Sequence, residues 1–205
     1  MMSTHWRFLI ANVVYGNRPG VVLDTLDKLI EKHDPDGLVL VETKNVDVAD
    51  LGDGWRVHQG RAWDLARRNA AVAWRAPLHA GRRRFIWGTD APGILDRYIT
   101  RARLTHGVDQ PRVAVDAMHL APGRVDSANR TYERQIEAHA RNRFKLWAGD
   151  MNESRIPELA LRYGLQFRRV GVMFVATNLP IRRFQVDHVK AFDHAVLVVD
   201  VEAPK

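Results

Sequence analysis

LWAGDMN, the stretch from Leu146 to Asn152, joins an apolar segment to a polar one. The apolar residues at 146–148 predict the end of a buried strand, and Gly149 predicts a turn directly after it. Asp150 and Asn152 follow two residues apart, so in an extended chain both side chains point to the same side. Such a pair suits a phosphate with its metal, because the carboxylate can face the cation or an attacking water while the amide donates to a phosphoryl oxygen. Taken alone, the stretch fits a plain strand and polar turn equally well.

Length and composition limit the classes of protein to consider. The 205 residues show no break in composition, which predicts one domain over residues 1–205. No apolar run approaches the roughly 20 residues of a membrane span, and the N-terminal segment lacks the pattern of a secretory signal, so we expect a cytoplasmic protein with no membrane partner. The chain has no cysteine, which excludes disulfides and thiolate metal sites and leaves hard-metal or purely organic chemistry.

The charge of the chain favours a polyanionic partner. Lys and Arg number 31 against 24 Asp and Glu, a formal net charge of +7 with an isoelectric point near 10.1. Each arginine cluster alone fits a solvated loop or a protected edge strand, but their summed field would concentrate nucleic acid, either DNA or RNA, at the surface. The clusters lie at residues 67–68, 82–84, 101 with 103, 168–169 and 182–183.

The hydrophobic pattern predicts a protein of many strands and few helices. Amphipathic spacing indicates helices over residues 21–33, 127–143 and 156–163. Apolar or alternating segments predict strands at residues 6–13, 37–44, 55–58, 69–75, 85–87, 98–105, 112–120, 146–148, 167–170, 172–176, 184–189 and 195–201.

Polar side chains of catalytic types follow several of these strands. Asn12 is either a turn former or an amide that orients a carboxylate or a scissile phosphate. Glu42 ends an apolar strand, where it forms a surface salt bridge or holds a divalent cation. His119, at the end of another strand, is either a structural histidine or a catalyst.

Two Asp-His dipeptides occur near the C-terminus. Asp187 has apolar neighbours, where a carboxylate is costly unless paired, so a hydrogen bond to an imidazole is expected. Asp193 and His194 precede the last strand. Because neighbouring strands can be antiparallel, the start of one strand and the end of another share one rim of a sheet.

Six segments, in this order, resemble the endonuclease/exonuclease/phosphatase superfamily. The resemblance extends over residues 8–201 and implies an α+β, four-layer α/β/β/α sandwich, in which two packed mixed β-sheets are flanked by helices as in the DNase I-like fold. Two departures stand out: Phe192 replaces the usual serine, and region 67–71 offers Arg68 and Asn69 where the family has a carboxylate beside the middle histidine. The segments are ANV at 11–13, VETK at 41–44, MHLAP at 118–122, GDMN at 149–152, VDHV at 186–189 and FDH at 192–194.

The resemblance also implies roles for individual residues. Glu42 would bind Mg²⁺ or Mn²⁺, assisted by Asn12 and Asp193. His194, oriented by Asp187, would act as general base or contact the phosphate. The remaining implied roles are water positioning by Asp150, a phosphoryl contact by Asn152, an acid near the leaving oxygen at His119, and a substrate contact by Asn12. Arg97, ahead of a predicted strand, is a further candidate for a phosphate contact.

The expected function is a metal-dependent phosphodiesterase that hydrolyses nucleic acid, a DNase in the first place, acting as a monomer. Two alternatives keep the fold. One is an enzyme for a small or lipid phosphoester, and the other is a non-catalytic nucleic-acid-binding protein. The basic surface argues against the first, and the presence of every metal and phosphate residue argues against the second.

Overall fold

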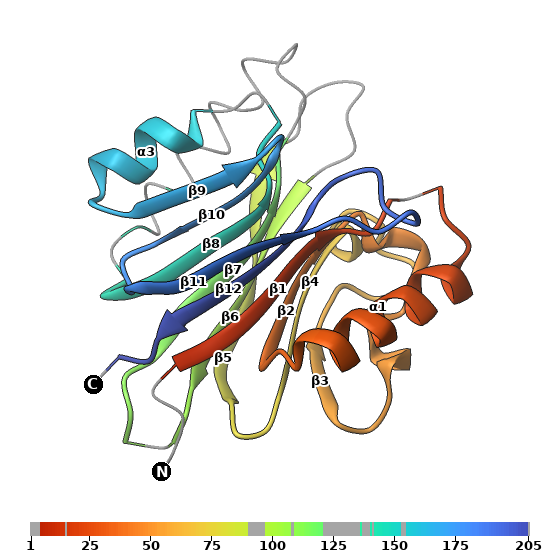
Figure 1. Cartoon of the computed structure of the whole chain (residues 1–205), viewed down its shortest axis with the longest axis horizontal. Helices are drawn as coiled ribbons and strands as arrows, with labels where there is room; N and C mark the ends of the chain where they lie inside the picture. Colours follow the sequence, from red (N-terminus) through yellow and green to blue (C-terminus); the bar gives the residue numbers. More distant parts are fainter. Residues whose placement is uncertain are drawn as a thin grey trace.

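Two six-stranded β-sheets pack face to face at the centre of the molecule (Figure 1). The structure is a computed structural model, and it describes residues 5–14, 16–89, 97–107, 109–120, 136, 140, 142–152 and 155–204. No helix within these ranges is long and apolar enough to cross a bilayer. The expected architecture of two packed mixed sheets with helices on their outer faces is confirmed.

Each sheet contains one parallel pair of strands, and its other pairs are antiparallel. In the first sheet the parallel pair is β1 with β2, and in the second it is β7 with β8. The first sheet has the order β11 (Ile181–Asp187), β12 (Val196–Glu202), β1 (His5–Asn12), β2 (Gly37–Val41), β4 (Ala70–Arg75), β3 (Trp55–His58). The second has the order β5 (His79–Thr89), β6 (Arg97–Thr105), β7 (Val113–His119), β8 (Phe144–Asp150), β10 (Met173–Thr177), β9 (Gln166–Val170).

Both faces of the central strands are buried, which explains their continuous apolar sequences. The layer between the sheets is the largest core cluster, with Phe8, Ile10, Val39, Val115, Leu146 and Val199 among its members. On the outer face of the first sheet lies α1 (Pro19–His33), which packs through Val22, Leu26 and Leu29. On the outer face of the second lies α3 (Ile156–Arg162).

Local sequence accounts for most boundaries. Pro19 occupies the first turn of α1, where its missing N–H costs nothing, and the helix ends at Asp34 in the left-handed conformation. The strand predicted at 85–87 is only part of β5, which begins at His79. The first part of the strand was not predicted, because the arginines at 82–84 are exposed on an edge strand and give no apolar pattern. Most of the helix predicted at 127–143 lies outside the described residues.

Strand direction brings the polar strand ends to one rim of the sandwich. In the first sheet, β1 and β2 run parallel and end there, while their antiparallel neighbours β12 and β4 begin there. In the second sheet, the parallel β7 and β8 end with His119 opposite Asp150. Short 3₁₀ helices, η1 (Thr43–Asn45), η2 (Val48–Leu51) and η3 (Arg67–Asn69), lie in the connections near β2, β3 and β4.

Candidate active site

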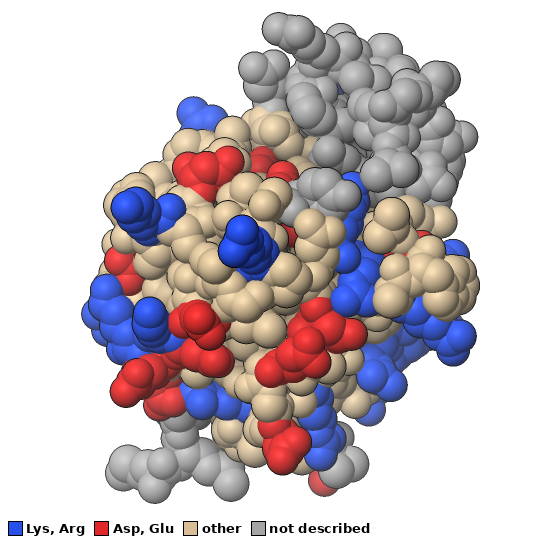
Figure 2. Space-filling view, turned by 90° about the vertical axis from the view of Figure 1, so that its right-hand side faces the viewer, with Lys and Arg blue, Asp and Glu red and all other residues tan. Residues whose placement is uncertain are grey.

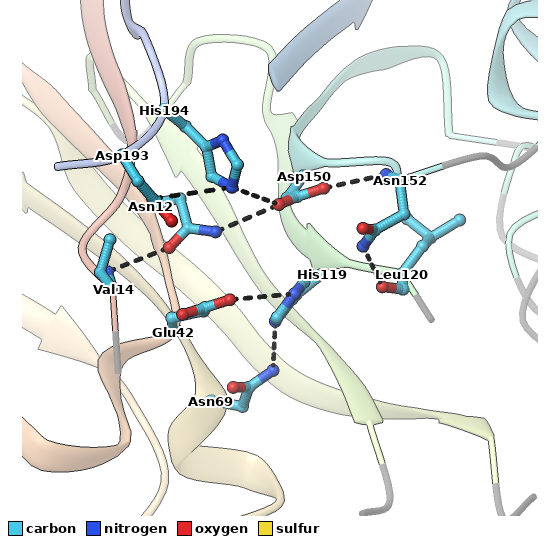
Figure 3. Close-up of polar contacts among 10 residues, drawn as sticks. All are labelled: Asn12, Val14, Glu42, Asn69, His119, Leu120, Asp150, Asn152, Asp193 and His194. Atoms are coloured by element: carbon cyan, nitrogen blue, oxygen red, sulfur yellow. Dashed lines mark hydrogen bonds and ion pairs between the residues drawn. The ribbon is translucent and has the colours of Figure 1, made fainter. Parts of the chain in front are cut away.

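Polar side chains from both sheets lie together at this rim (Figure 3). The carboxylate of Asp150, at the end of β8, is linked across the sandwich to β1 by the amide of Asn12, whose Nδ2 donates to Asp150 Oδ2 over 3.1 Å. Asn12 Oδ1 in turn accepts a hydrogen bond of 3.0 Å from Val14 N–H. Residues 138 positions apart in the sequence are therefore in direct contact.

Asp150 is the most deeply placed acid of the group, with a relative exposure of 2%. Burial raises the pKa of its carboxyl group above the ordinary value, and the nearby carboxylate of Glu42 adds to this rise. Hydrogen bonds from Asn152 N–H and Asn12, together with His194, counteract the rise in pKa. Two carboxylates, one of them buried, bring negative charge together at this rim, which a cation would stabilise.

Gly149 places Asp150 at this depth by close packing. Contrary to the expectation of a turn, β8 continues through Gly149 and ends at Asp150. Its φ of 137° is unfavourable for other residues, and a Cβ at this position would lie 2.0 Å from the carbonyl oxygen of Met118 in β7. Only glycine allows β7 and β8 to pair this closely beside the site.

His119 is held between the sheets by a neutral partner. Its Nδ1 lies 2.9 Å from Asn69 Nδ2, and its Nε2 lies 3.5 Å from Glu42 Oε1. As placed, the amide of Asn69 donates to Nδ1, so a neutral imidazole carries its proton on Nε2, facing Glu42. Asn69 was noted in the sequence only as a departure from the family pattern. Its position directly before β4, which runs antiparallel to β2, brings it to the rim.

Glu42 follows β2 directly and has a left-handed backbone, with φ of 62°. This conformation is uncommon for residues other than glycine and asparagine, and such strain is often found at functional sites. The strand predicted to reach residue 44 therefore stops at Val41. The carboxylate of Glu42 retains 25% of its side-chain exposure, so it is accessible to a ligand at the rim.

His194 lies in the segment before β12 and faces the two acids on either side of it. Its Nε2 is 3.7 Å from Asp150 Oδ2 and 3.7 Å from Asp193 Oδ1. The side chain of Asp193 is 62% exposed, so it lies at the outer margin of the group. In the second sheet, the β10 residue opposite Asp150 is the fully buried Met173, so β10 adds no charged side chain at that point.

The expected pairing of Asp187 with His194 is wrong. Asp187 Oδ2 lies 2.7 Å from Lys32 Nζ and 2.9 Å from His33 Nε2, at the C-terminal end of α1, and its Oδ1 accepts from the N–H of His188. The hydrogen bonds from Lys32 and then His33 lower the pKa of Asp187 to about 2. The carboxylate does find an imidazole, as its apolar neighbours suggested, but that imidazole belongs to a helix rather than to the site.

Two further predicted residues have different surroundings. Asn152 has a left-handed backbone, with φ of 47°. Its Nδ2 donates to Leu120 O over 2.6 Å, which fixes the amide and leaves one N–H for other partners. Arg97 is the first residue of β6, and its side chain lies outside the described part of the chain.

The donor set fits a hard cation that keeps part of its hydration shell. Within the described residues, no group of three or more His, Cys, Asp or Glu is arranged to hold a metal ion. A cage made by protein alone is therefore not built here. Mg²⁺ needs only one or two carboxylates, with water and substrate oxygens completing its octahedron. Glu42 and the amide of Asn12, near the buried Asp150, are the groups that could provide such a partial shell.

Comparison with solved structures agrees with this architecture. The chain is similar to an endonuclease/exonuclease/phosphatase family protein from Bacteroides thetaiotaomicron, with a TM-score of 0.77, 11% identity and coverage of 100% of both chains. A protein of the same description from Bacteroides vulgatus gives a TM-score of 0.75 at 13% identity, with 98% of this chain and 100% of that one covered. An AP endonuclease from Leishmania major gives 0.70 at 16% identity, covering 98% and 89%.

Sequence comparison finds no such relatives. No family model matches the chain, and no curated protein matches it. At these identities, the structural likeness concerns the course of the backbone over nearly the whole chain. The protein has the DNase I-like fold of the endonuclease/exonuclease/phosphatase proteins.

Proposed function

We propose that the protein is a Mg²⁺- or Mn²⁺-dependent phosphodiesterase that hydrolyses nucleic acid, with DNA as the favoured substrate. The observation that carries the proposal is the contact of side chains from distant parts of the chain at one rim. Asp150 contacts Asn12 and lies near His194, while His119 lies between Asn69 and Glu42. Carboxylates, imidazoles and amides in one group are the residue types that phosphodiester hydrolysis uses.

Asp150 would position the attacking water. Its two oxygens are fixed by Asn12 and by the N–H of Asn152, so the carboxylate has one orientation. Fixed acceptors cost no reorganisation during the reaction. His194, next to Asp150, would accept a proton or contact a phosphoryl oxygen, and Asn152 would donate its second amide N–H to the phosphoryl group.

His119 would donate a proton to the leaving oxygen. The proton on Nε2, set by the contact of Nδ1 with Asn69, is the one that this role requires. Asn69 is neutral, so it orients the imidazole without the charge that a carboxylate would offer to an imidazolium ion.

Glu42 would hold the cation, with Asn12 and Asp193 as assisting ligands. A bound Mg²⁺ or Mn²⁺ would neutralise charge on the phosphoryl oxygens and favour in-line displacement. The excess of positive charge supports a polyanionic substrate. In Figure 2, which views the side that lies on the right in Figure 1, Lys and Arg side chains extend down the right-hand part of the view, others lie at its left edge and centre, and Asp and Glu side chains lie between them.

A substrate panel tests the proposal. Supercoiled and linear duplex DNA, single-stranded DNA, RNA, abasic duplex and inositol phosphates would be incubated with Mg²⁺ or Mn²⁺ and with excess chelator. We expect metal-dependent cleavage of one or more nucleic acids. Turnover of inositol phosphates alone would move the assignment to small phosphoesters, and unchanged cleavage in chelator would exclude the role of Glu42.

A further inference from the structure

A cavity lies where the edge strands of the two sheets meet. β3 is an edge strand of the first sheet and β5 of the second, and the rings of His58 and Phe85 join them at a centroid distance of 4.3 Å. The cavity has a volume of about 810 Å³, in the range of sites for small organic ligands. Its lining includes His58, Arg61, Trp63, Arg67, Arg83 and Arg84.

The loop that carries Trp63 is closed by its own hydrogen bonds. Gly60 N–H donates to Arg67 O over 3.3 Å, and Asp64 accepts from Arg67 N at 3.1 Å and from Arg67 Nη1 at 2.7 Å. A Cβ on Gly60 would lie 2.5 Å from the backbone of Arg67, so only glycine permits this closure. The loop nevertheless leaves Trp63 with 74% of its surface exposed. An exposed indole on a braced loop is available to stack with a planar ligand.

The arginines of the cavity differ in whether their charge is paired with a carboxylate. Arg67 is paired with Asp64, and its guanidinium lies 4.9 Å from the centre of the Tyr98 ring. By contrast, neither Arg61 nor Arg83 forms an ion pair within the part of the chain that the structure describes. These two arginines can therefore bind an anion that enters the cavity.

His58 adds an uncharged polar group to the cavity wall. Burial, with a contribution from the positive charge of Arg83, lowers the pKa of His58 to about 4, so the ring is neutral at pH 7. Its Nε2 is buried and has no hydrogen-bond partner among the described residues. The wall thus combines an uncharged ring with cationic groups, a combination suited to a base attached to a phosphate.

The cavity adjoins the active site through η3. Arg67 lines the cavity, and Asn69, two residues later, contacts His119. Their Cα atoms are at most about 7.6 Å apart, because consecutive Cα atoms are about 3.8 Å apart. A strand with its scissile phosphate at Asp150 would therefore reach the cavity within a few nucleotides.

We propose that this cavity, the Trp63 pocket, binds an unpaired nucleotide that flanks the scissile phosphate, with the base stacked on Trp63 and the phosphates facing Arg61, Arg83 and Arg84. The proposal rests on the proposed function, because it assigns the pocket to the same substrate strand. A base must leave its stack to enter the pocket, which costs less in a single strand or frayed end than in a duplex. The pocket therefore favours single-stranded or frayed substrates.

Direct binding measurements test the pocket. Fluorescence anisotropy of a fluorescein-labelled octathymidylate would be measured in excess chelator, so that no cleavage occurs. Trp63→Ala is expected to raise Kd by about 5- to 150-fold, the effect of losing one stacked base. The double variant Arg83→Ala/Arg84→Ala is expected to raise Kd and to reduce the salt dependence, log Kd against log salt, by about 1.4, since each phosphate contact on single strands contributes about 0.7.

Matched controls exist elsewhere on the surface. Leu161 on α3 is exposed to 81%, and Arg168 with Arg169 lies exposed on β9, the opposite edge strand of the sheet that contains β5. Leu161→Ala and the double variant Arg168→Ala/Arg169→Ala should leave Kd within twofold of the wild type. If the β9 variant lost affinity to the same extent, the weaker binding would be explained by net charge alone, and the proposal would be overturned.

Oligonucleotides with one abasic position locate the stacked base. In the wild type, removing the base at one position should weaken binding, and Trp63→Ala should abolish that sensitivity, as a double-mutant cycle requires for a direct contact. Trp63→Ala with a Kd within twofold of the wild type, or a wild type that binds no oligonucleotide at low salt, would overturn the proposal. Because the assay needs no turnover, a protein that binds in this way but cleaves nothing would refute the proposed function alone.

Discussion

Replacing Gly149 by alanine tests whether close pairing of β7 and β8 positions the site. The new Cβ would lie 2.0 Å from the carbonyl oxygen of Met118 and 3.1 Å from a methyl group of Val41, and the backbone φ of 137° does not suit alanine. The backbone strain costs about 1–3 kcal/mol. Overpacking costs about 1–3 kcal/mol more. We therefore expect Gly149→Ala to lower the free energy of unfolding by about 2–6 kcal/mol, summing these two terms.

The clash would also displace the carboxylate of Asp150. The Cβ meets backbone rather than a flexible side chain, so β8 must move by roughly 1 Å, and a misplacement of this size costs about 100-fold in rate. Urea unfolding would measure the stability, and kcat/KM on the best nucleic-acid substrate would measure the activity of the folded fraction.

A second glycine provides the control. Gly171 also has a positive φ, 57°, but a Cβ there would have nothing within 4 Å. Gly171→Ala should cost about 1 kcal/mol from the left-handed backbone alone and leave activity unchanged. If Gly149→Ala equals Gly171→Ala in both stability and activity, the close contact with Met118 does not position Asp150, and the reasoning fails.

Two further substitutions probe residues whose contacts the structure defines. Asn69→Ala removes the group that orients His119. The loss of such a partner should lower kcat by about 10- to 100-fold with KM little changed. An unchanged kcat would show that the imidazole needs no orientation by Asn69. Asp187→Asn should lower stability by about 1 kcal/mol at pH 6–7, a figure discounted for solvent screening. Because the pKa of Asp187 is lowered to about 2 in the folded state, the carboxylate stabilises the fold above its ordinary pKa and loses this effect as pH falls towards 2. Urea unfolding of both proteins at pH 6 and pH 3 should show the difference shrinking at acid pH, and a difference that grows would contradict the sign.

The sequence predicted most of the fold because the strands are buried on both faces. Central strands such as Ala70–Arg75 have apolar patterns that periodicity detects. β5 was predicted too short because its exposed arginines have no period that distinguishes a strand from a loop. The order of the strands within each sheet was not predicted, since periodicity carries no information on which strands are neighbours.

Residue type and position at the strand ends predicted which residues lie at the rim of the sandwich. They did not predict which side chains contact one another. Asp187 shows the limit. Its need for a partner followed from its apolar neighbours, but that partner is His33, which comes close only because α1 packs beside β11. Asn69 shows the opposite case: noted in the sequence only as a departure from the family motif, it contacts His119. Side-chain partners depend on tertiary packing, which the local sequence does not contain.

The most direct test of the central claim compares two chemically identical changes on the same sandwich. Asp150→Asn should abolish metal-dependent cleavage of DNA while the far-UV circular dichroism stays that of the wild type. Asp187→Asn, an aspartate outside the site, should retain full cleavage. Full activity of Asp150→Asn, or equal loss in both variants, would contradict the account.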